Sequence, residues 1–380
     1  MRKIAYSLLI SSLLVLIIFI FSEPVIILLA KCQLKKVFIG SVISIKDCSL
    51  KPTHLLSFSD IEIKKENLYD FKFSKIEIQY NIFSLLRRGI VKLSLQQAGI
   101  SVSLPHKSIF EMTKFIKLAP SSAFFICSLE LSGLELNLNS NDLTLLAKLS
   151  SDFNLSKQSI NYLKLKIDLL DAKGFRLENA SLNIEQNMSG GELFIQKIGY
   201  DKLIIKEIKG KAKLEKDSLS FDHITAELFN GEFTGYFALK INKDRVYLVN
   251  LKFINIDLEE FVKDFNLDDK FEASGKLGGV LSLKGRNLNI ESLNGDFSTS
   301  ESGGKLVIKD ARFLENLANS SKQSFDLLVE NFKDYHYNTG LTKLSLDKGN
   351  LIFNIALEGG DGRRNLIITV HNFKLGRGEL

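Results

Sequence analysis

Residues 208–241 read IKGKAKLEKDSLSFDHITAELFNGEFTGYFALKI, and the spacing of apolar residues in this stretch determines the predicted fold. In its first seven residues, apolar or small side chains alternate with lysines, and residues 233–239 repeat the alternation. Successive side chains of a β-strand point to opposite faces, so this period of two predicts strands with one apolar and one solvated face. Among the residues that lie between these two segments, the apolar positions change from odd to even numbers. A β-bulge at Asp222 and His223 would keep these apolar side chains on one face.

The same alternation recurs through most of the chain after residue 42. We therefore predict a mainly β fold, an elongated, highly curved and mostly antiparallel sheet of about twenty strands. Residues 288–297 and 305–309 are predicted as two of these strands. The few expected helices cannot cover such a sheet, so it either closes on itself or leaves a long apolar groove.

Helical periodicity predicts four short interruptions of the sheet. Asp257 and Glu260 have the spacing of a capping box, with Asp257 as the N-cap residue. The last of the four helical segments is expected to break near residues 319–321. The segments are residues 24–38, 108–118, 257–265 and 312–332.

The N-terminus has the composition of a membrane anchor. Residues 4–22 (IAYSLLISSLLVLIIFIFS) carry no charge, and a run of about 20 apolar residues suffices for a transmembrane helix. No small-x-small cleavage site follows, so we expect residues 1–30 to form a retained signal anchor rather than a cleaved signal peptide. Lys31 occupies the position before Cys32 where a lipoprotein signal needs a small residue. The flanking positive charges are nearly balanced, and we expect the N-terminus inside and the body outside.

The composition argues against several classes of function. The net charge of +6 is spread thinly, without the basic stripe of a nucleic-acid-binding protein. The three cysteines lack the CxxC spacing of a zinc site or a disulfide framework. No nucleophile, metal-ligand or phosphate-binding motif is present, so we predict no catalytic residue, no metal site, no cofactor and no enzymatic activity. We interpret the polar and aromatic cluster at residues 334–337 as a packing corner between a helix and a strand, since a metal or acid–base site needs further partners.

Eight stretches resemble the AsmA-like superfamily of bacterial envelope proteins, and those in the C-terminal part are most similar to the YdbH type. They occur in the order that this superfamily shows. They are residues 76–89 (IEIQYNIFSLLRRG), 90–95 (IVKLSL), 98–102 (AGISV), 227–235 (ELFNGEFTG), 256–260 (IDLEE), 275–285 (GKLGGVLSLKG), 331–337 (NFKDYHY) and 347–359 (DKGNLIFNIALEG).

This resemblance implies a taco-like β-groove along which phospholipid acyl chains move between the inner and outer membranes. For the YdbH type it also implies a small outer-membrane lipoprotein that extends the sheet at its C-terminal edge. About twenty strands spaced about 4.8 Å apart give only about 95 Å of sheet, which makes such a partner more necessary. The implied regions are an anchor (1–30), an AsmA-like N-terminal β region with helices (31–120), a β-groove middle (121–255) and a YdbH-like C-terminal β region (256–380).

The leading hypothesis is a single-pass protein of the bacterial inner membrane, with its body in the periplasm, that moves phospholipid without enzymatic chemistry. The alternative is a structural or assembly scaffold that affects outer-membrane protein biogenesis and carries no lipid; its phenylalanines would form an ordinary packed core. Under the leading hypothesis, the side chains expected to line the groove are Phe233, Phe237, Leu239, Phe353 and Ile355.

Overall fold

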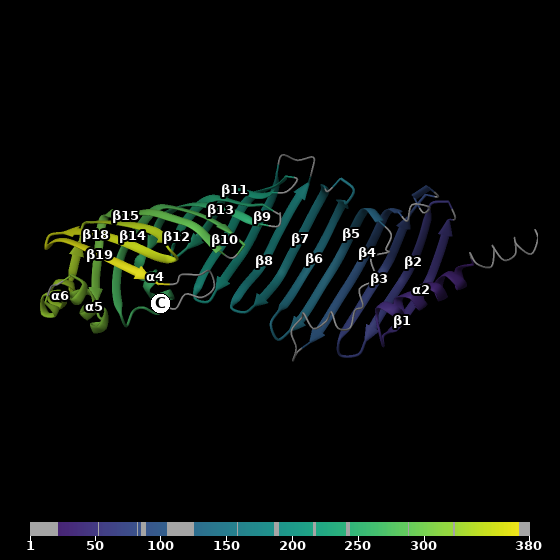
Figure 1. Cartoon of the computed structure of the whole chain (residues 1–380), viewed down its shortest axis with the longest axis horizontal. Coiled ribbons are helices and arrows are strands. Elements are labelled where there is room, and N and C mark those ends of the chain that lie inside the picture. Colours follow the sequence, from purple (N-terminus) through teal and green to yellow (C-terminus); the bar gives the residue numbers. More distant parts are fainter. Residues whose placement is uncertain are drawn as a thin grey trace, which may run out of the picture. The chain divides into compact units, whose positions relative to one another are not determined.

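The structure, a computed structural model, falls into two compact units, residues 1–188 and 189–380, which we describe separately (Figure 1). The predicted anchor, residues 1–30, lies mostly outside the described residues, and the predicted helix 108–118 lies wholly outside them. None of the helices in the described ranges is long and apolar enough to span a membrane. The structure describes residues 22–51, 53–81, 83–84, 89–104, 125–157, 159–185, 190–215, 218–240, 244–287, 289–321 and 324–371.

The first unit is a sheet with a helix against one end of it (Figure 1). Each of its strands pairs with the next one along the chain. All of these pairings are antiparallel except that of β4 with β5, which is parallel. The elements are α2 (Glu23–Val37), β1 (Val42–Lys51), β2 (Leu55–Lys65), β3 (Tyr69–Gln79), β4 (Gly89–Leu104), β5 (Phe125–Ser140), β6 (Thr144–Asn154), β7 (Ser159–Ala172) and β8 (Phe175–Glu185).

A row of irregular positions crosses β2 to β5 at one level of the sheet. Asp60, Gln97 and Gly133 have positive φ angles of 50°, 46° and 67°. The flanking cross-strand pairs place these three residues and Ser74 of β3 side by side. At this level the apolar positions of each strand change between odd and even numbers. The irregularity therefore keeps apolar side chains on one face along the whole length of the strands.

The second unit is a fully antiparallel sheet with three short helices. Its strands follow chain order, and the long strand β15 pairs with both β16 and β17. The two strands expected at residues 288–297 and 305–309 are parts of this single strand. The elements are β9 (Gly191–Tyr200), β10 (Leu203–Glu215), β11 (Ser218–Leu228), β12 (Gly231–Lys240), β13 (Val246–Asp257), α4 (Leu258–Asp264), β14 (Phe271–Arg286), β15 (Asn289–Ile308), α5 (Ala311–Ser321), α6 (Phe325–Phe332), β16 (Tyr335–Tyr337), β17 (Thr339–Asp347), β18 (Asn350–Gly359) and β19 (Gly362–Val370).

The predicted bulge in β11 is confirmed. Its register with β12 shifts between Phe221 and Ile224, and His223 between them has a φ of 51°. A comparable shift occurs in β13, where Asn255 has a φ of 56°. The bulge in β11 lets Phe221 and Ile224 point to the same face although their positions differ by three, an odd number.

The starts and ends of the helices follow from local side-chain chemistry. The carboxylate of Asp257 accepts hydrogen bonds from the backbone N–H groups of Glu259 and Glu260, at 2.9 and 3.4 Å, which confirms Asp257 as the N-cap of α4. The predicted break is also confirmed, because α5 and α6 are separate helices. Ser324 caps α6, accepting a hydrogen bond from the N–H of Leu327 at 3.3 Å.

Helix α2 covers the apolar face of the first strands. The ring of Phe38, directly after the helix, lies edge-on to Phe71, with centroids 5.7 Å apart, and 6.2 Å from the ring of Tyr69. The side chains of α2, together with Phe38, pack against a cluster of buried residues from β1 to β4. These side chains are Ile26, Ile27, Ala30, Leu34 and Phe38.

Helices α5 and α6 cover part of the second sheet, and the hydroxyl groups of two tyrosines hold the chain that follows these helices. Leu328 and Phe332 of α6 are buried against Leu366 of β19. Tyr335 and Tyr337 of β16 donate hydrogen bonds to the carbonyls of Gly362 and Ser274, both at 2.7 Å. The predicted packing corner at residues 334–337 is therefore confirmed.

The mainly β, mostly antiparallel fold with few short helices is confirmed, with nineteen strands among the described residues. The predicted division into residues 1–30, 31–120, 121–255 and 256–380 stays a prediction.

Candidate functional site

Apolar side chains of the second unit gather on one face of its sheet. Directly opposed residues of neighbouring strands share a face, and the register runs from Phe233 through Phe253 and Gly279 to Phe297 across β12 to β15. The ring centroids of Phe233 and Phe253 are 5.8 Å apart, and so are those of Phe253 and Phe297. Rings at this separation are in contact. The four strands therefore share one unbroken aromatic row.

Gly279 makes the last contact in this row possible. It lies between Phe253 and Phe297, and a Cβ on it would be 2.6 Å from a ring carbon of Phe297. The ring therefore occupies the space above the glycine and reaches Phe253. Gly278 and Gly279 both lie within β14, and Gly279 makes room for the neighbouring ring.

The five residues predicted to line a groove lie on this same face. From Phe297 the register continues through Thr342 of β17 to Ile355 of β18, which links the two groups of candidates. Whether these side chains contact lipid stays a prediction. They are Phe233, Phe237 and Leu239 on β12, and Phe353 and Ile355 on β18.

Part of this face is open and part lies beneath helices. The cluster around Phe233, which includes Phe237, takes all its described members from β9 to β13, and we call this part the β9–β13 face. No helix residue belongs to that cluster among the residues that the structure describes. Ile355, in contrast, packs against the cluster formed by α5, α6 and Leu366. Phe237 is therefore a candidate for ligand contact on an open surface, and Ile355 lies at its covered end.

The first unit has a similar apolar surface that the sequence candidates did not include, and its described members contain no helix residue. Its buried residues are Ala98, Leu131 and Leu134, surrounded by half-buried side chains of β3 to β6, and we call it the β3–β6 face. The signal was present in the sequence as the change from odd to even positions between Phe73 and Ile76. Without the register, the strands could not be assigned to one face.

The opposite face of the sheet is polar and solvated, as predicted. On β10, Lys209, Lys211 and Lys213 are exposed. Lys213 pairs with Glu215 at 2.6 Å and Lys209 with Glu207 at 3.4 Å. Exposed pairs of this kind contribute little to stability, but they keep this face in water.

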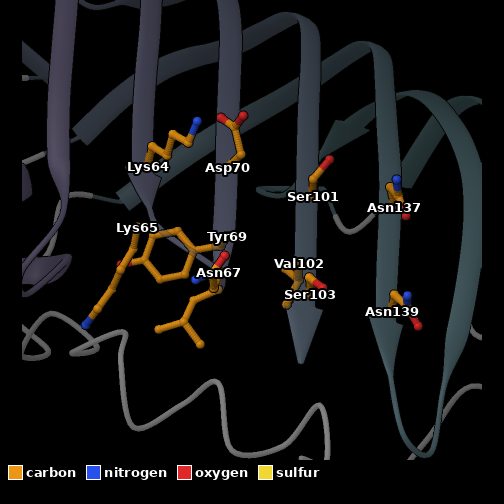
Figure 2. Close-up of a pocket in the computed structure, with 11 residues that line it drawn as sticks. Lys64, Lys65, Asn67, Tyr69, Asp70, Ser101, Val102, Ser103, Asn137 and Asn139 are labelled. Carbon is orange, nitrogen blue, oxygen red and sulfur yellow. The ribbon is translucent and has the colours of Figure 1, made fainter. Parts of the chain in front are cut away.

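A pocket of about 270 Å³ lies in the first unit, where β2 to β5 come side by side (Figure 2). The register aligns Lys64, Asp70, Ser101 and Asn137 in one row across the four strands. Asp70 also pairs with Lys72, at 3.0 Å. Tyr69 and Val102, which belong to the buried apolar cluster beneath α2, also line this pocket, so it is not confined to the polar face.

Among the residues that the structure describes, the titratable groups form no reactive constellation. Burial raises the pKa of Tyr337 to about 12, and its hydroxyl is a structural donor to Ser274. A hydrogen bond from Lys305, at 3.0 Å, holds the pKa of Asp334 below its ordinary value, and His336 lies 3.4 Å from the same carboxylate. Asp334 and His336 are largely exposed, and Lys305 is half-buried. Within the described ranges, no group of three or more histidine, cysteine, aspartate or glutamate residues has the geometry of a metal site.

A family model described as "YdbH-like: Intermembrane phospholipid transport protein YdbH" matches residues 128–360, which is more than half of the chain. The chain belongs to the YdbH-like family. The matched residues include β6 to β8 of the first unit and every strand of the second unit up to β18, so the β9–β13 face lies wholly within the YdbH-like region. No curated protein and no solved structure gave a significant match.

Proposed function

We propose that this protein carries phospholipids between the inner and outer membranes of a bacterial envelope, with acyl chains held on its apolar sheet faces and without enzymatic chemistry. The β9–β13 face is the single observation that most supports the proposal. It is continuous across strands, rich in phenylalanine and free of helical cover among the described residues. Membership of the YdbH-like family, described by intermembrane phospholipid transport, supports the same substrate class.

The energetics favour sliding over release into water. Each methylene group that leaves water gains about 0.8 kcal/mol. Along the row from Phe233 to Phe297, every step from one strand to the next replaces one apolar contact with another. Because this gain stays nearly constant along the row, an acyl chain moves without a large barrier. The charged headgroup remains in water at the solvated rim of the sheet.

The proposed location is the inner membrane, with residues 1–30 as a single-pass anchor and the body in the periplasm. The charge-free run at residues 4–22 supports the anchor. Intermembrane transport also requires a protein that has access to a bilayer surface.

The C-terminal edge of the sheet is the proposed site for a small outer-membrane lipoprotein. Among the described residues β19 pairs only with β18, and Ile367 on β19 is 69% exposed. An unpaired strand edge accepts a further strand through main-chain hydrogen bonds. Such a strand would lengthen the sheet toward the outer membrane.

Photo-cross-linking in living cells tests lipid carriage in the full chain. A photoreactive phenylalanine analogue at Phe237 is compared with the same analogue at Thr234, three residues away on the polar face of β12. With phosphate-labelled cells, we expect a labelled phospholipid adduct at position 237 and none at position 234. A folded protein that gives no adduct at 237, or equal adducts at both positions, would contradict the proposal; protein adducts at 237 would favour the scaffold alternative.

A further inference from the structure

Helix α2 is apolar on two sides, and only one of them is covered. Its inward side chains pack on the first strands of the sheet. On the outward side, Leu28 and Leu29 are 61% and 54% exposed, and Cys32 one turn later is also exposed. A helix on the surface of a soluble domain normally has polar residues on its outward side. Residues 25–30 of α2 (VIILLA) contain none.

Three of the four charged residues of α2 are lysines in its C-terminal half, at positions 31, 35 and 36. Lys35 and Lys36 lie in the last turn and are exposed. The acidic residue of the helix, Glu23, lies in the first turn and is exposed, at the opposite end from the lysines. The outward surface therefore combines exposed leucines with lysines, which is the composition of helices that lie in the membrane interface.

Chain connectivity places this surface next to the proposed anchor. The charge-free run at residues 4–22 ends one residue before α2 begins. At about 1.5 Å per residue, the 15 residues of α2 extend only about 22 Å, too short to cross a bilayer. A bilayer that holds the run at 4–22 is therefore within reach of α2 but cannot enclose it as a second span.

We propose that α2 lies along the surface of the anchoring membrane, with Leu28 and Leu29 inserted between lipid headgroups and Lys35 and Lys36 paired with lipid phosphates. This inference rests on the proposed anchoring of residues 1–30 and goes beyond it, since an anchor alone leaves the body free to turn on its tether. The occupant of the exposed helix side is a lipid bilayer, not a protein.

Several contacts fix α2 to the sheet, so a membrane that holds the helix also orients the first strands. Ser41, after the helix, lies 2.6 Å from the hydroxyl of Tyr69, and Lys65 donates a hydrogen bond to the carbonyl of Ile39 at 3.1 Å. Phe38 packs on the rings of Tyr69 and Phe71. The helix therefore sets the angle at which the apolar face of β1 to β3 meets the bilayer.

Fluorescence quenching tests the position of α2 in the full chain. The protein contains no tryptophan, so the L29W variant carries a single tryptophan. It is reconstituted into vesicles of phosphatidylethanolamine and phosphatidylglycerol, with or without phosphatidylcholine brominated near the headgroup end of its acyl chains. An interfacial helix inserts about 5–10 Å, so we expect an about two-fold loss of emission with the brominated lipid.

The L155W variant is the matched control. Leu155 is exposed in the turn between β6 and β7, away from α2, and its emission is expected to be unchanged by brominated lipid. L28W repeats the test on the same helix side if L29W does not fold. Unquenched emission at both helix positions would overturn the proposal. Blue-shifted but unquenched emission would indicate a protein partner or a second copy instead, which also overturns it.

This test is independent of lipid carriage. Phospholipid adducts at Phe237 with no quenching at position 29 would leave the proposed function intact and remove the inference about α2. Quenching at position 29 without adducts at Phe237 would support the inference about α2 and contradict the proposed lipid carriage.

Discussion

Replacing Phe237 with glutamate places a carboxyl group in the proposed path of the acyl chains. Phe237 lies on the β9–β13 face, with its ring 6.0 Å from that of Phe221. When a lipid covers the new carboxyl group, the group must either remain charged in an apolar environment or take up a proton. Protonation limits the penalty. From the ordinary glutamate pKa of about 4.3 to pH 7, it costs about 3.7 kcal/mol, equivalent to an about 500-fold loss of lipid occupancy.

The pH dependence of this effect distinguishes charge from lost packing. Lipid binding raises the pKa of the introduced glutamate, so the penalty is present at neutral pH and declines as the pH falls toward 4.3. At pH 5 the remaining cost is about 1 kcal/mol, or about five-fold in occupancy. F237Q keeps the shape of the glutamate but not its charge, and its occupancy is expected to be independent of pH over this range.

The assay is the yield of phospholipid adduct in isolated membranes, with the photoreactive analogue at Phe221. Thr234→Glu serves as the matched control, because Thr234 lies on the polar face opposite Lys252 and its replacement is expected to leave the yield unchanged. Circular dichroism checks that the variants fold. Unchanged adduct yield in folded F237E at neutral pH would refute a lipid path past Phe237.

Three further outcomes follow from the packing. Phe332→Ala is expected to lower the free energy of unfolding by about 3–5 kcal/mol in urea, because the ring is buried beneath α6; Leu327→Ala on the exposed side should change it by less than about 0.5 kcal/mol. The buried thiol of Cys48, with its pKa raised to about 11, should carry more than about 100-fold less thiolate at pH 8 than an ordinary cysteine, so mass spectrometry should find only the two exposed cysteines labelled by a maleimide. His223→Val should destabilise the protein by about 1–2 kcal/mol, since φ is 51° there, whereas thermal unfolding of His223→Gly should match the native protein.

Local features were predictable because neighbouring residues determine them. The odd-to-even change around His223 required a bulge, and the carboxylate of Asp257 followed by acidic residues required a helix start; both were found. Features that depend on distant residues were not predictable. Nothing near β4 indicates that β5 pairs with it in parallel, and the cover of α5 and α6 over Ile355 depends on contacts between separate parts of the chain.

The apolar face of the second unit also combines features that neighbouring residues determine with features that distant residues determine. Alternation identified Phe233 and Phe237 as residues of one face, but Phe253 and Phe297 complete the aromatic row only through a register that crosses three strand pairs. The glycine pair at 278 and 279 gives no sign in the sequence of the Phe297 ring that lies over Gly279. The bulges in each strand decide which residues meet, and their effects accumulate from strand to strand.

The single parallel pairing has a consequence for biosynthesis. Strands β1 to β4 can pair by successive hairpins as soon as they are made, but the outer edge of β4 has no partner until β5 is complete at Ser140. At about 5–20 residues per second, the 36 residues after Leu104 take about 2–7 seconds to synthesise. During that interval the nascent chain presents an open strand with an apolar face, a surface on which two unfinished chains can join. The first unit therefore needs protection from aggregation at this stage of its synthesis. In the second unit β15 has a similar delay, because its partner β17 follows only after α5, α6 and β16.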